Sequence, residues 1–164
     1  MNPSMKQIVY RGGVAQFCVP ASWVEEYEPA GGGTFYEDKP GTGTLRVNVM
    51  DLKKKSGDSP STETAHDLLL EISKTNSVES LPNGVALARS TRGAIENGEQ
   101  LLLHTWHIGV RVTPSHFRII VFTYTILAKQ ESTRDVQQEI AMFDGSISKG
   151  VYPAVEGVAG NYPP

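Results

Sequence analysis

The sequence predicts an α+β fold in which an antiparallel β-sheet of about six strands is flanked by helices, as an α/β/α sandwich. Residues 44–52 alternate apolar and polar side chains, which is typical of a strand with one buried face. Residues 117–127 are apolar at odd and at even positions, so we expect this strand in the middle of the sheet with layers on both sides. Two further segments, ending near residues 75 and 149, place apolar side chains at helical spacing.

The remaining strands follow from β-prone pieces and the turns between them. Short pieces at residues 7–10 and 14–19 are separated by a turn at Gly12. Pro20 ends the second piece because proline cannot donate to a strand ladder. Asn97 followed by glycine is a strong signal for a hairpin turn in the second half. The other predicted strands are residues 23–27, 33–36, 85–94 and 99–112.

The first helix follows a polar segment with several possible caps. Ser59 precedes Pro60, which suits an N-cap followed by proline at the first helical position, and Ser61 or Thr62 could cap instead. Asn76 is expected to close the helix. The apolar stripe consists of Ala65, Leu68, Leu69 and Ile72.

The second helix ends the predicted domain. Ser132 and Asp135 resemble a capping box, and Gly150 is a favourable stop after Lys149. We therefore expect a single domain over residues 1–150. Residues 151–164 are rich in proline and glycine and predict a loose C-terminal tail.

Composition excludes several classes of protein. The chain has 164 residues, 39% of them hydrophobic and 20% charged, which fits one globular domain. It carries 15 Lys and Arg against 18 Asp and Glu, whereas nucleic-acid-binding domains usually have a basic excess. The one basic run, at residues 53–55, is expected to be a solvated strand end. Nucleic acid is therefore not expected as a partner.

The compartment is expected to be the cytoplasm. The single cysteine, Cys18, lies in an apolar strand and is expected to be a buried, inert thiol. The N-terminal residues lack the apolar stretch of a signal peptide, although a signal peptide removed earlier would leave no trace. No apolar run reaches the length of a membrane span, so no membrane association is expected.

Two short motifs resemble a known superfamily. The leading strand enters a turn that contains Pro20 and Trp23, and the last helix carries Phe143 followed by Ser146 and Ile147 near its end. With the order of strands, helix, strand meander and terminal helix, this resembles the superfamily that includes PsbP, the Ran-binding Mog proteins and the bacterial DcrB-like proteins. The resemblance implies an antiparallel sheet between helices and binding or accessory roles. No acidic patch matches a Ran-binding surface, so that partner is not carried over.

No catalytic, metal or cofactor site is expected. His104 and His107 are three residues apart on a strand, so they point to opposite faces and cannot easily share a metal. The three glycines that begin at Gly31 precede a β-like segment, not the helix that a phosphate loop needs. Arg118 and Arg111 could form an ion-pair patch with Glu99 across the hairpin, which would contribute little if exposed. No nucleophile motif of the Gly-x-Ser-x-Gly type occurs.

The candidate protein-binding surface lies around the glycine loop. Aromatic side chains beside permissive backbone are a plausible contact for another protein. The alternative is that Trp23 and Phe35 only cap the core. The candidate residues are Tyr27, Gly31, Gly32, Gly33, Phe35, Tyr36 and Asp38.

These observations predict a non-enzymatic protein-binding accessory protein. The resemblance implies a chaperone, an adaptor or an immunity-like protein associated with bacterial secretion, and the partner is another protein of unknown identity. The alternative is a small-ligand-binding protein or enzyme with a pocket between sheet and helix, using His104 or His107. A third hypothesis is a structural subunit that dimerises through a sheet edge.

Overall fold

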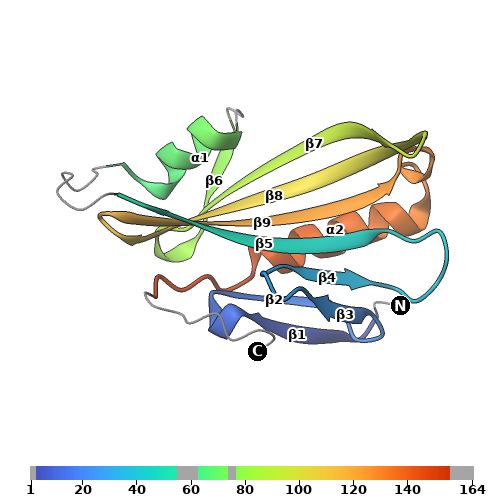
Figure 1. Ribbon diagram of the computed structural model, residues 1–164, viewed down its shortest axis with the longest axis horizontal. Coiled ribbons are helices and arrows are strands. Elements are labelled where there is room, and N and C mark those ends of the chain that lie inside the picture. Colours follow the sequence, from blue (N-terminus) through green and yellow to red (C-terminus); the bar gives the residue numbers. More distant parts are fainter. Residues whose placement is uncertain (1–2, 55–62, 74–76, 156–164) are drawn as a thin grey trace.

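The computed structural model describes residues 3–54, 63–73 and 77–155 of the chain (Figure 1). Seven strands form one antiparallel sheet in the order β3-β4-β5-β9-β8-β7-β6, and β1 and β2 form a separate two-stranded sheet. The predicted α+β fold is confirmed. The strands are β1 Met5–Tyr10, β2 Ala15–Pro20, β3 Val24–Tyr27, β4 Gly33–Tyr36, β5 Thr44–Lys53, β6 Val78–Ser80, β7 Ala86–Glu96, β8 Glu99–Thr113 and β9 His116–Leu127. The α-helices are α1 Ala65–Ser73 and α2 Arg134–Ser148.

Strand β9 is the middle strand of the seven, as its apolar character on both faces predicts. Its side chains from Ile120 to Ile126 at even positions enter the main core, on the side of α2 and the β1–β2 sheet. At odd positions, Phe117 and Ile119 pack under α1 on the opposite side. Figure 1 shows α2 behind the sheet and α1 over one end only. The sandwich is therefore complete on one face and partial on the other.

The main core is aromatic. Phe17 of β2 makes edge-on contacts with Phe35 of β4 and Phe122 of β9, with ring centroids 5.5 and 4.9 Å apart. Trp23 packs edge-on against Phe143 of α2. Pro20 and Trp23, the first and last residues of this turn, are both buried. This turn therefore joins the β1–β2 sheet to α2, which explains why the motif predicts fold rather than function.

Helix α1 packs closely because the strand beneath it has a glycine. A Cβ atom at Gly109 would lie 3.0 Å from Cγ of Leu69 and 3.3 Å from the Ala65 carbonyl oxygen. The helix begins with a capping box in which Thr64 Oγ1 accepts from the Asp67 amide and the Asp67 carboxylate accepts from the Thr64 amide, both at 3.1 Å. The predicted caps at residues 59–62 and the predicted end at Asn76 lie outside the described residues.

Helix α2 starts one residue later than its predicted cap. Thr133, not Ser132, is the N-cap, and its side chain accepts from the Val136 amide. At the other end the amide of Gly150 donates to the Ile147 carbonyl, as expected for a stop at this glycine. Among the described residues, neither α1 nor α2 is long and apolar enough to cross a membrane.

Residues 151–155 are packed rather than loose. Val151 and Gln16 exchange two backbone hydrogen bonds of 2.9 Å, which adds a bridge to β2. Tyr152 is buried in the main core, where its hydroxyl donates to the Ile147 carbonyl at 2.6 Å. The predicted tail is wrong for these residues because a buried aromatic outweighs the local proline and glycine content. Residues 156–164 lie outside the described part of the chain.

Arg118 is buried, and both Arg118 and Arg111 lie at the end of the sheet that is far from Glu99, so the expected ion-pair patch is wrong. Nε of Arg118 lies 3.1 Å from Oδ1 of Asp51, which also lies 2.6 Å from Nε2 of His116. Burial alone would raise the pKa of the Asp51 carboxyl, but the His116 hydrogen bond and the Arg118 charge together lower it. The group is a structural ion-pair cluster between β5 and β9.

Candidate binding surfaces

The glycine loop is held by the core rather than free. Gly31 and Gly32 have φ values of 98° and 124°, which strongly favour glycine. The Gly32 amide donates to the buried Tyr10 hydroxyl at 2.8 Å, and a Cβ atom there would lie 3.2 Å from the Asn48 side chain. Gly32 and Gly33 are buried. These glycines shape the β3–β4 turn and present little surface.

The aromatic candidates divide between core and surface. Phe35 is fully buried, and half-buried Tyr27 packs between the Tyr10 ring and Phe35. Tyr36 is half-exposed and its hydroxyl donates to Glu26 at 2.6 Å. Asp38 is exposed in the following loop. The predicted contact surface is therefore accessible mainly at Tyr36 and Asp38, and its role in binding stays a prediction.

A larger surface lies on the side of the sheet that carries α1. We call the part beyond α1 the open face, and define it by two neighbouring rows of side chains that cross β4, β5, β9, β8 and β7. The first row is Thr34, Arg46, Thr123, Thr105 and Ser90. The second row is Tyr36, Thr44, Thr125, Leu103 and Arg92.

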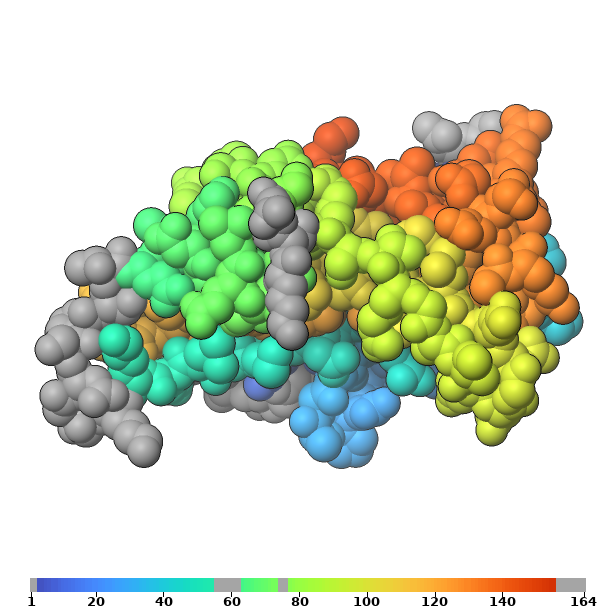
Figure 2. Space-filling model, turned by 90° about the horizontal axis from the view of Figure 1, so that it is seen from above, coloured from blue at the N-terminus to red at the C-terminus, as the bar shows by residue number. Residues whose placement is uncertain are grey.

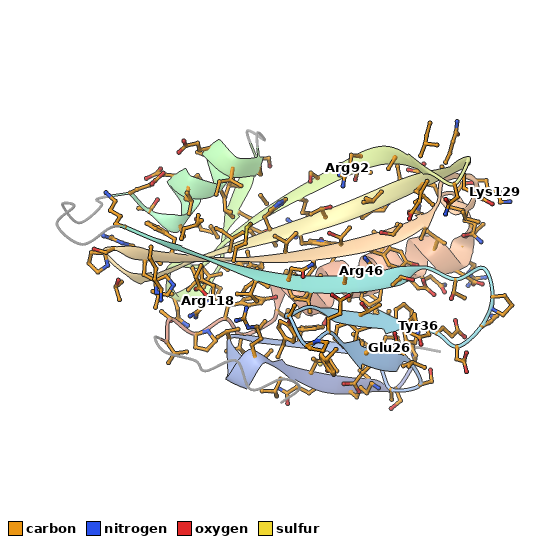
Figure 3. The ribbon with its side chains drawn as sticks, viewed as in Figure 1. Glu26, Tyr36, Arg46, Arg92, Arg118 and Lys129 are labelled. Atoms are coloured by element: carbon orange, nitrogen blue, oxygen red, sulfur yellow. The ribbon has the colours of Figure 1, made fainter. Side chains whose placement is uncertain are left out.

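The open face combines hydroxyl groups with two exposed cations. Arg46 and Arg92 are exposed, and no described residue forms an ion pair or hydrogen bond with either guanidinium. Three strand-to-strand steps and one row separate them, or about 16 Å at the usual strand spacing and rise. Figure 3 shows Arg46 on β5 and Arg92 on β7, with Glu26 and Tyr36 toward the β3 edge. Among the described helices only α1 packs on this face, and it does so on β6, β7 and β8.

His107 borders the open face. On β8 it lies two residues after Thr105, next to the first row and opposite Val121 of β9. Its Nδ1 is buried without a hydrogen-bond partner. Burial lowers the pKa of the His107 imidazole, so the neutral form is favoured. His104 faces the other side, as strand parity predicts.

A small pocket lies between the outer edge of β7 and α2, and we call it the edge pocket. Its volume is about 130 Å³. His104 lines it with a buried Nε2 that has no hydrogen-bond partner, while its Nδ1 lies 3.2 Å from the Thr91 hydroxyl. Burial lowers the pKa of His104, against a small opposing effect of Glu131. The lining residues are Arg89, Ser90, Thr91, His104, Thr105, Trp106, Ile140 and Asp144.

The carboxylate of the edge pocket is already engaged. Trp106 Nε1 donates to Asp144 at 2.9 Å, and Arg89 Nη2 donates to the same carboxylate at 3.2 Å. Arg89 also bridges to Glu79 at 2.8 Å. The arrangement places His104 in a pocket between the sheet and α2, as the alternative hypothesis expects. The Asp144 carboxylate lines the same pocket, but no hydrogen bond joins it to His104. In the described part of the chain, no three His, Cys, Asp or Glu side chains are grouped to hold a metal ion.

Sequence reasoning missed the open face and the edge pocket. The open face had a signal: on residues 117–127 the odd positions change from Ile119 and Val121 to Thr123 and Thr125, where the covering helix ends. The edge pocket had none, because it depends on which strand lies at the edge of the sheet.

The fold resembles two solved structures at low sequence identity. A protein of Bacteroides thetaiotaomicron matches with a TM-score of 0.60 and 17% identity over 93% of this chain. This chain spans about half of that protein, 49% of its length. LpqN, involved in cell envelope biogenesis of Mycobacterium tuberculosis, matches with a TM-score of 0.54 and 13% identity over 92% of this chain and 91% of LpqN.

These likenesses show the fold and nothing finer. No protein-family model and no curated protein matches the chain. The resemblance to the PsbP, Mog and DcrB-like superfamily stays a prediction from the sequence motifs.

Proposed function

We propose that this chain is a non-enzymatic accessory protein that binds an acidic segment of another protein on its open face. The carrying observation is the pair of exposed, unpartnered arginines, Arg46 and Arg92, on a sheet face that no described helix covers. Complementary charge sets partner choice and speeds encounter more than it sets raw affinity. The hydroxyls and half-buried Leu103 between the two arginines supply hydrogen-bonding groups and apolar contact.

Within this class, the resemblance stated above favours a chaperone, an adaptor or an immunity-like protein associated with bacterial secretion. The proposed compartment is the cytoplasm. The likeness to LpqN, which is involved in cell envelope biogenesis, raises the envelope as the alternative. Fractionation of source cells, with detection by an antibody to this chain, distinguishes the two compartments. A cytoplasmic protein separates with the soluble fraction, and an envelope protein separates with the envelope fraction.

The test is affinity capture with charge-reversed baits. The bait Arg46→Glu with Arg92→Glu replaces both cations of the open face. Lys129→Glu makes the same kind of change in the 3-10 turn Ala128–Gln130 that follows β9, outside the two rows (Figure 3). Like charges across an interface cost several kcal/mol, so a loss of about 2 kcal/mol, or about 30-fold in Kd, is expected for the double variant. The control is expected to bind like the wild type.

The supporting result is one protein captured by the wild type and by Lys129→Glu, lost with the double variant, and bound through an acidic segment. Binding should also weaken as salt is raised. A partner retained by the double variant would exclude the open face. If no protein is captured at any salt concentration, the protein-binding function itself is excluded.

A second candidate function, small-ligand binding, rests on the unpartnered Nε2 of His104 in the edge pocket. Ligand screening by thermal shift tests it. A compound that stabilises the wild type should lose this effect in His104→Ala, and an unchanged shift would exclude the pocket as its site.

A further inference from the structure

The outer edge of β7 is open for most of its length. Strand β6 pairs with β7 only from Ala86 to Ala88, whereas β7 continues to Glu96. Within the described part of the chain, no strand pairs with the outer side of residues 89–96. We call this stretch the free edge. In Figure 2, which looks down on β7, its yellow-green atoms lie at the surface between α1 in green and α2 in orange.

The backbone groups that point outward follow from the register. The Leu81 amide donates to the Val85 carbonyl at 2.7 Å, so the backbone of Val85 faces β6. Because antiparallel strands alternate hydrogen-bonded and non-hydrogen-bonded pairs, odd residues of β7 face outward and even ones face β8. The β7–β8 hairpin gives the same result independently. Only two residues separate Glu96 from Glu99, so these two form a hydrogen-bonded pair and the backbone of Glu96 faces β8. Outward N–H and C=O groups therefore belong to Arg89, Thr91, Gly93 and Ile95.

The free edge has only part of the usual protection against strand pairing. Edge strands are commonly short, bulged, or guarded by proline or charged side chains, lysine above all. Residues 89–96 carry the charged residues Arg89, Arg92 and Glu96 but contain neither proline nor lysine, and the pairing of β7 with β8 runs without a bulge from Ala86 to Glu96. An unbulged strand of this length is a template for another strand.

A protruding side chain and a receiving pocket both lie along this edge. Ile95 is 75% exposed, the largest value among the large hydrophobic residues that are exposed. Odd positions of β7 lie on the α2 side, as the contacts of Arg89 with Asp144 and of Thr91 with His104 show. The edge pocket opens on that same side beside Thr91, and its 130 Å³ compares with a cavity of about 150 Å³ that accepts benzene. Gly93, between Thr91 and Ile95, has no side chain to block approach.

We propose that two copies of the chain pair antiparallel along their free edges, with the twofold axis at Gly93. This register places Gly93 against Gly93 of the second copy and Thr91 against Ile95 of the second copy. The side chain of each Ile95 then lies over the edge pocket of the other copy, beside Ile140 and Trp106. The two seven-stranded sheets join into one. The contact is self-complementary, as a twofold interface requires.

Like charges disfavour one neighbouring register, and the pocket contact disfavours the other. An axis at Arg92 would set two like charges directly opposite each other, which is destabilising. An axis at Ala94 would set Arg92 opposite Glu96 of the second copy, but it would move Ile95 away from the pocket and toward Gly93 of the second copy. With the axis at Gly93, each Arg92 lies diagonal to both Glu96 and Arg92 of the second copy, so the pocket contact, not charge, selects this register. No described residue forms an ion pair with Arg92 or Glu96 within one chain.

The occupant is a second copy, and this inference is independent of the function proposed for the open face. The free edge and the edge pocket lie at one margin of the sheet, whereas the open face spans its surface. Arg92 belongs to both surfaces, so the dimerisation variants are placed at Gly93 and Ile95, which lie outside the two rows of the open face. The partner-capture result and the dimerisation result can therefore fail separately.

The first test measures mass by size-exclusion chromatography with light scattering across a concentration series. The wild type is expected to reach twice the mass of one chain. Gly93→Pro removes the outward N–H of residue 93, which makes no hydrogen bond to β8. This variant is expected to be a monomer. Gly93→Ala keeps the N–H, and its Cβ has room, with the nearest atom the Leu101 oxygen at 3.8 Å. This matched control is expected to remain a dimer.

A second pair of variants tests the pocket contact. Ile95→Asp places a charge where an apolar side chain is buried, and a weakening of dimerisation of at least 30-fold is expected. Ile95→Val keeps most of the apolar contact and is expected to stay within a few-fold of the wild type. Because Ile95 is exposed in one chain, both variants should keep the melting temperature of the monomer. Circular dichroism checks that every variant is folded.

The register itself is tested by cross-linking in a Cys18→Ser background. A hydrogen-bonded antiparallel pair has Cα atoms about 5.5 Å apart, within the range for a disulfide. Gly93→Cys is therefore expected to form a covalent dimer on oxidation, and Ala94→Cys is not. A covalent dimer from Ala94→Cys alone would overturn this register. A wild type that stays monomeric, or a dimer unaffected by both Gly93→Pro and Ile95→Asp, would overturn the proposal.

Discussion

Replacement of Tyr152 tests whether the segment after α2 belongs to the core. Tyr152 is 5% exposed, its ring lies 6.3 Å from the Phe122 ring, and its hydroxyl donates to the Ile147 carbonyl. An aromatic side chain buries about 150–250 Å², which corresponds to an upper limit of about 4–6 kcal/mol at 25 cal/mol per Å². Truncation of buried aromatics to alanine costs about 3–5 kcal/mol. Tyr152→Ala is therefore expected to lower the free energy of unfolding by about 3–5 kcal/mol.

Two controls separate the hydrogen bond from the packing. Tyr152→Phe keeps the ring and loses one bond, and the Ile147 carbonyl still accepts from the Gly150 amide, so a cost of about 1 kcal/mol is expected. Val151→Ala changes a side chain that is 53% exposed and is expected to stay within about 0.5 kcal/mol of the wild type.

The assay is equilibrium urea unfolding followed by circular dichroism and tryptophan fluorescence. For a domain of this size, about 3–5 kcal/mol corresponds to a fall in Tm of roughly 6–20 °C. A Tyr152→Ala variant within about 0.5 kcal/mol of the wild type would refute the packing of residues 151–155. A loss shared equally by Val151→Ala would also refute it, because the exposed neighbour carries no comparable burial.

Three other changes have outcomes set by the structure. Asp51→Ala leaves the buried Arg118 without its carboxylate, but Asp51 itself is 34% exposed, so a loss of about 2–3 kcal/mol in urea unfolding is expected, below the value for a fully buried pair, and a loss under 1 kcal/mol would contradict the ion pair. Gly43→Ala places a methyl group against the fully buried ring of Tyr124, so we expect a loss of about 1–3 kcal/mol by the same method, and an unchanged free energy of unfolding would contradict this close contact. Burial lowers the pKa of His107 in the folded state, so the unfolded chain binds the proton first and stability falls as pH drops below about 6.5. His107→Gln should reduce the loss of unfolding free energy measured between pH 7.5 and 5.5. An unchanged loss would show that other groups cause this pH dependence.

The sequence predicts the centre of this fold better than its margins. Residues 117–127 carry apolar side chains on both faces, and they form the middle strand because only a covered strand tolerates that composition. Strand β6 escaped notice because Val78–Ser80 is three residues long and has no alternation to detect. The N-cap of α2 moved by one residue because Ser132 and Thr133 are both good caps and only backbone geometry chooses between them.

The candidate binding surfaces were harder to predict because the exposure of a side chain depends on which distant elements of the chain pack beside it. Phe35 and Tyr36 are adjacent aromatic residues, yet one is core and the other surface, and parity alone does not tell which face is buried. The glycine loop has a permissive backbone by sequence, but it is held by the Tyr10 hydroxyl, which binds Gly32 from 22 residues away along the chain. The free edge of β7 exists only because β6 is short, and strand order cannot be read from local pattern.

The opposite orientation of His104 and His107 gives the molecule two built-in probes. One imidazole lines the edge pocket and the other borders the open face, although only three residues separate them in the chain. In a proton NMR spectrum, the ring signals of each histidine would respond to an event on its own side of the sheet. Dimerisation through β7 should shift the resonances of His104, and a partner on the open face should shift those of His107. A single titration could thus assign a binding event to one side before any partner is identified.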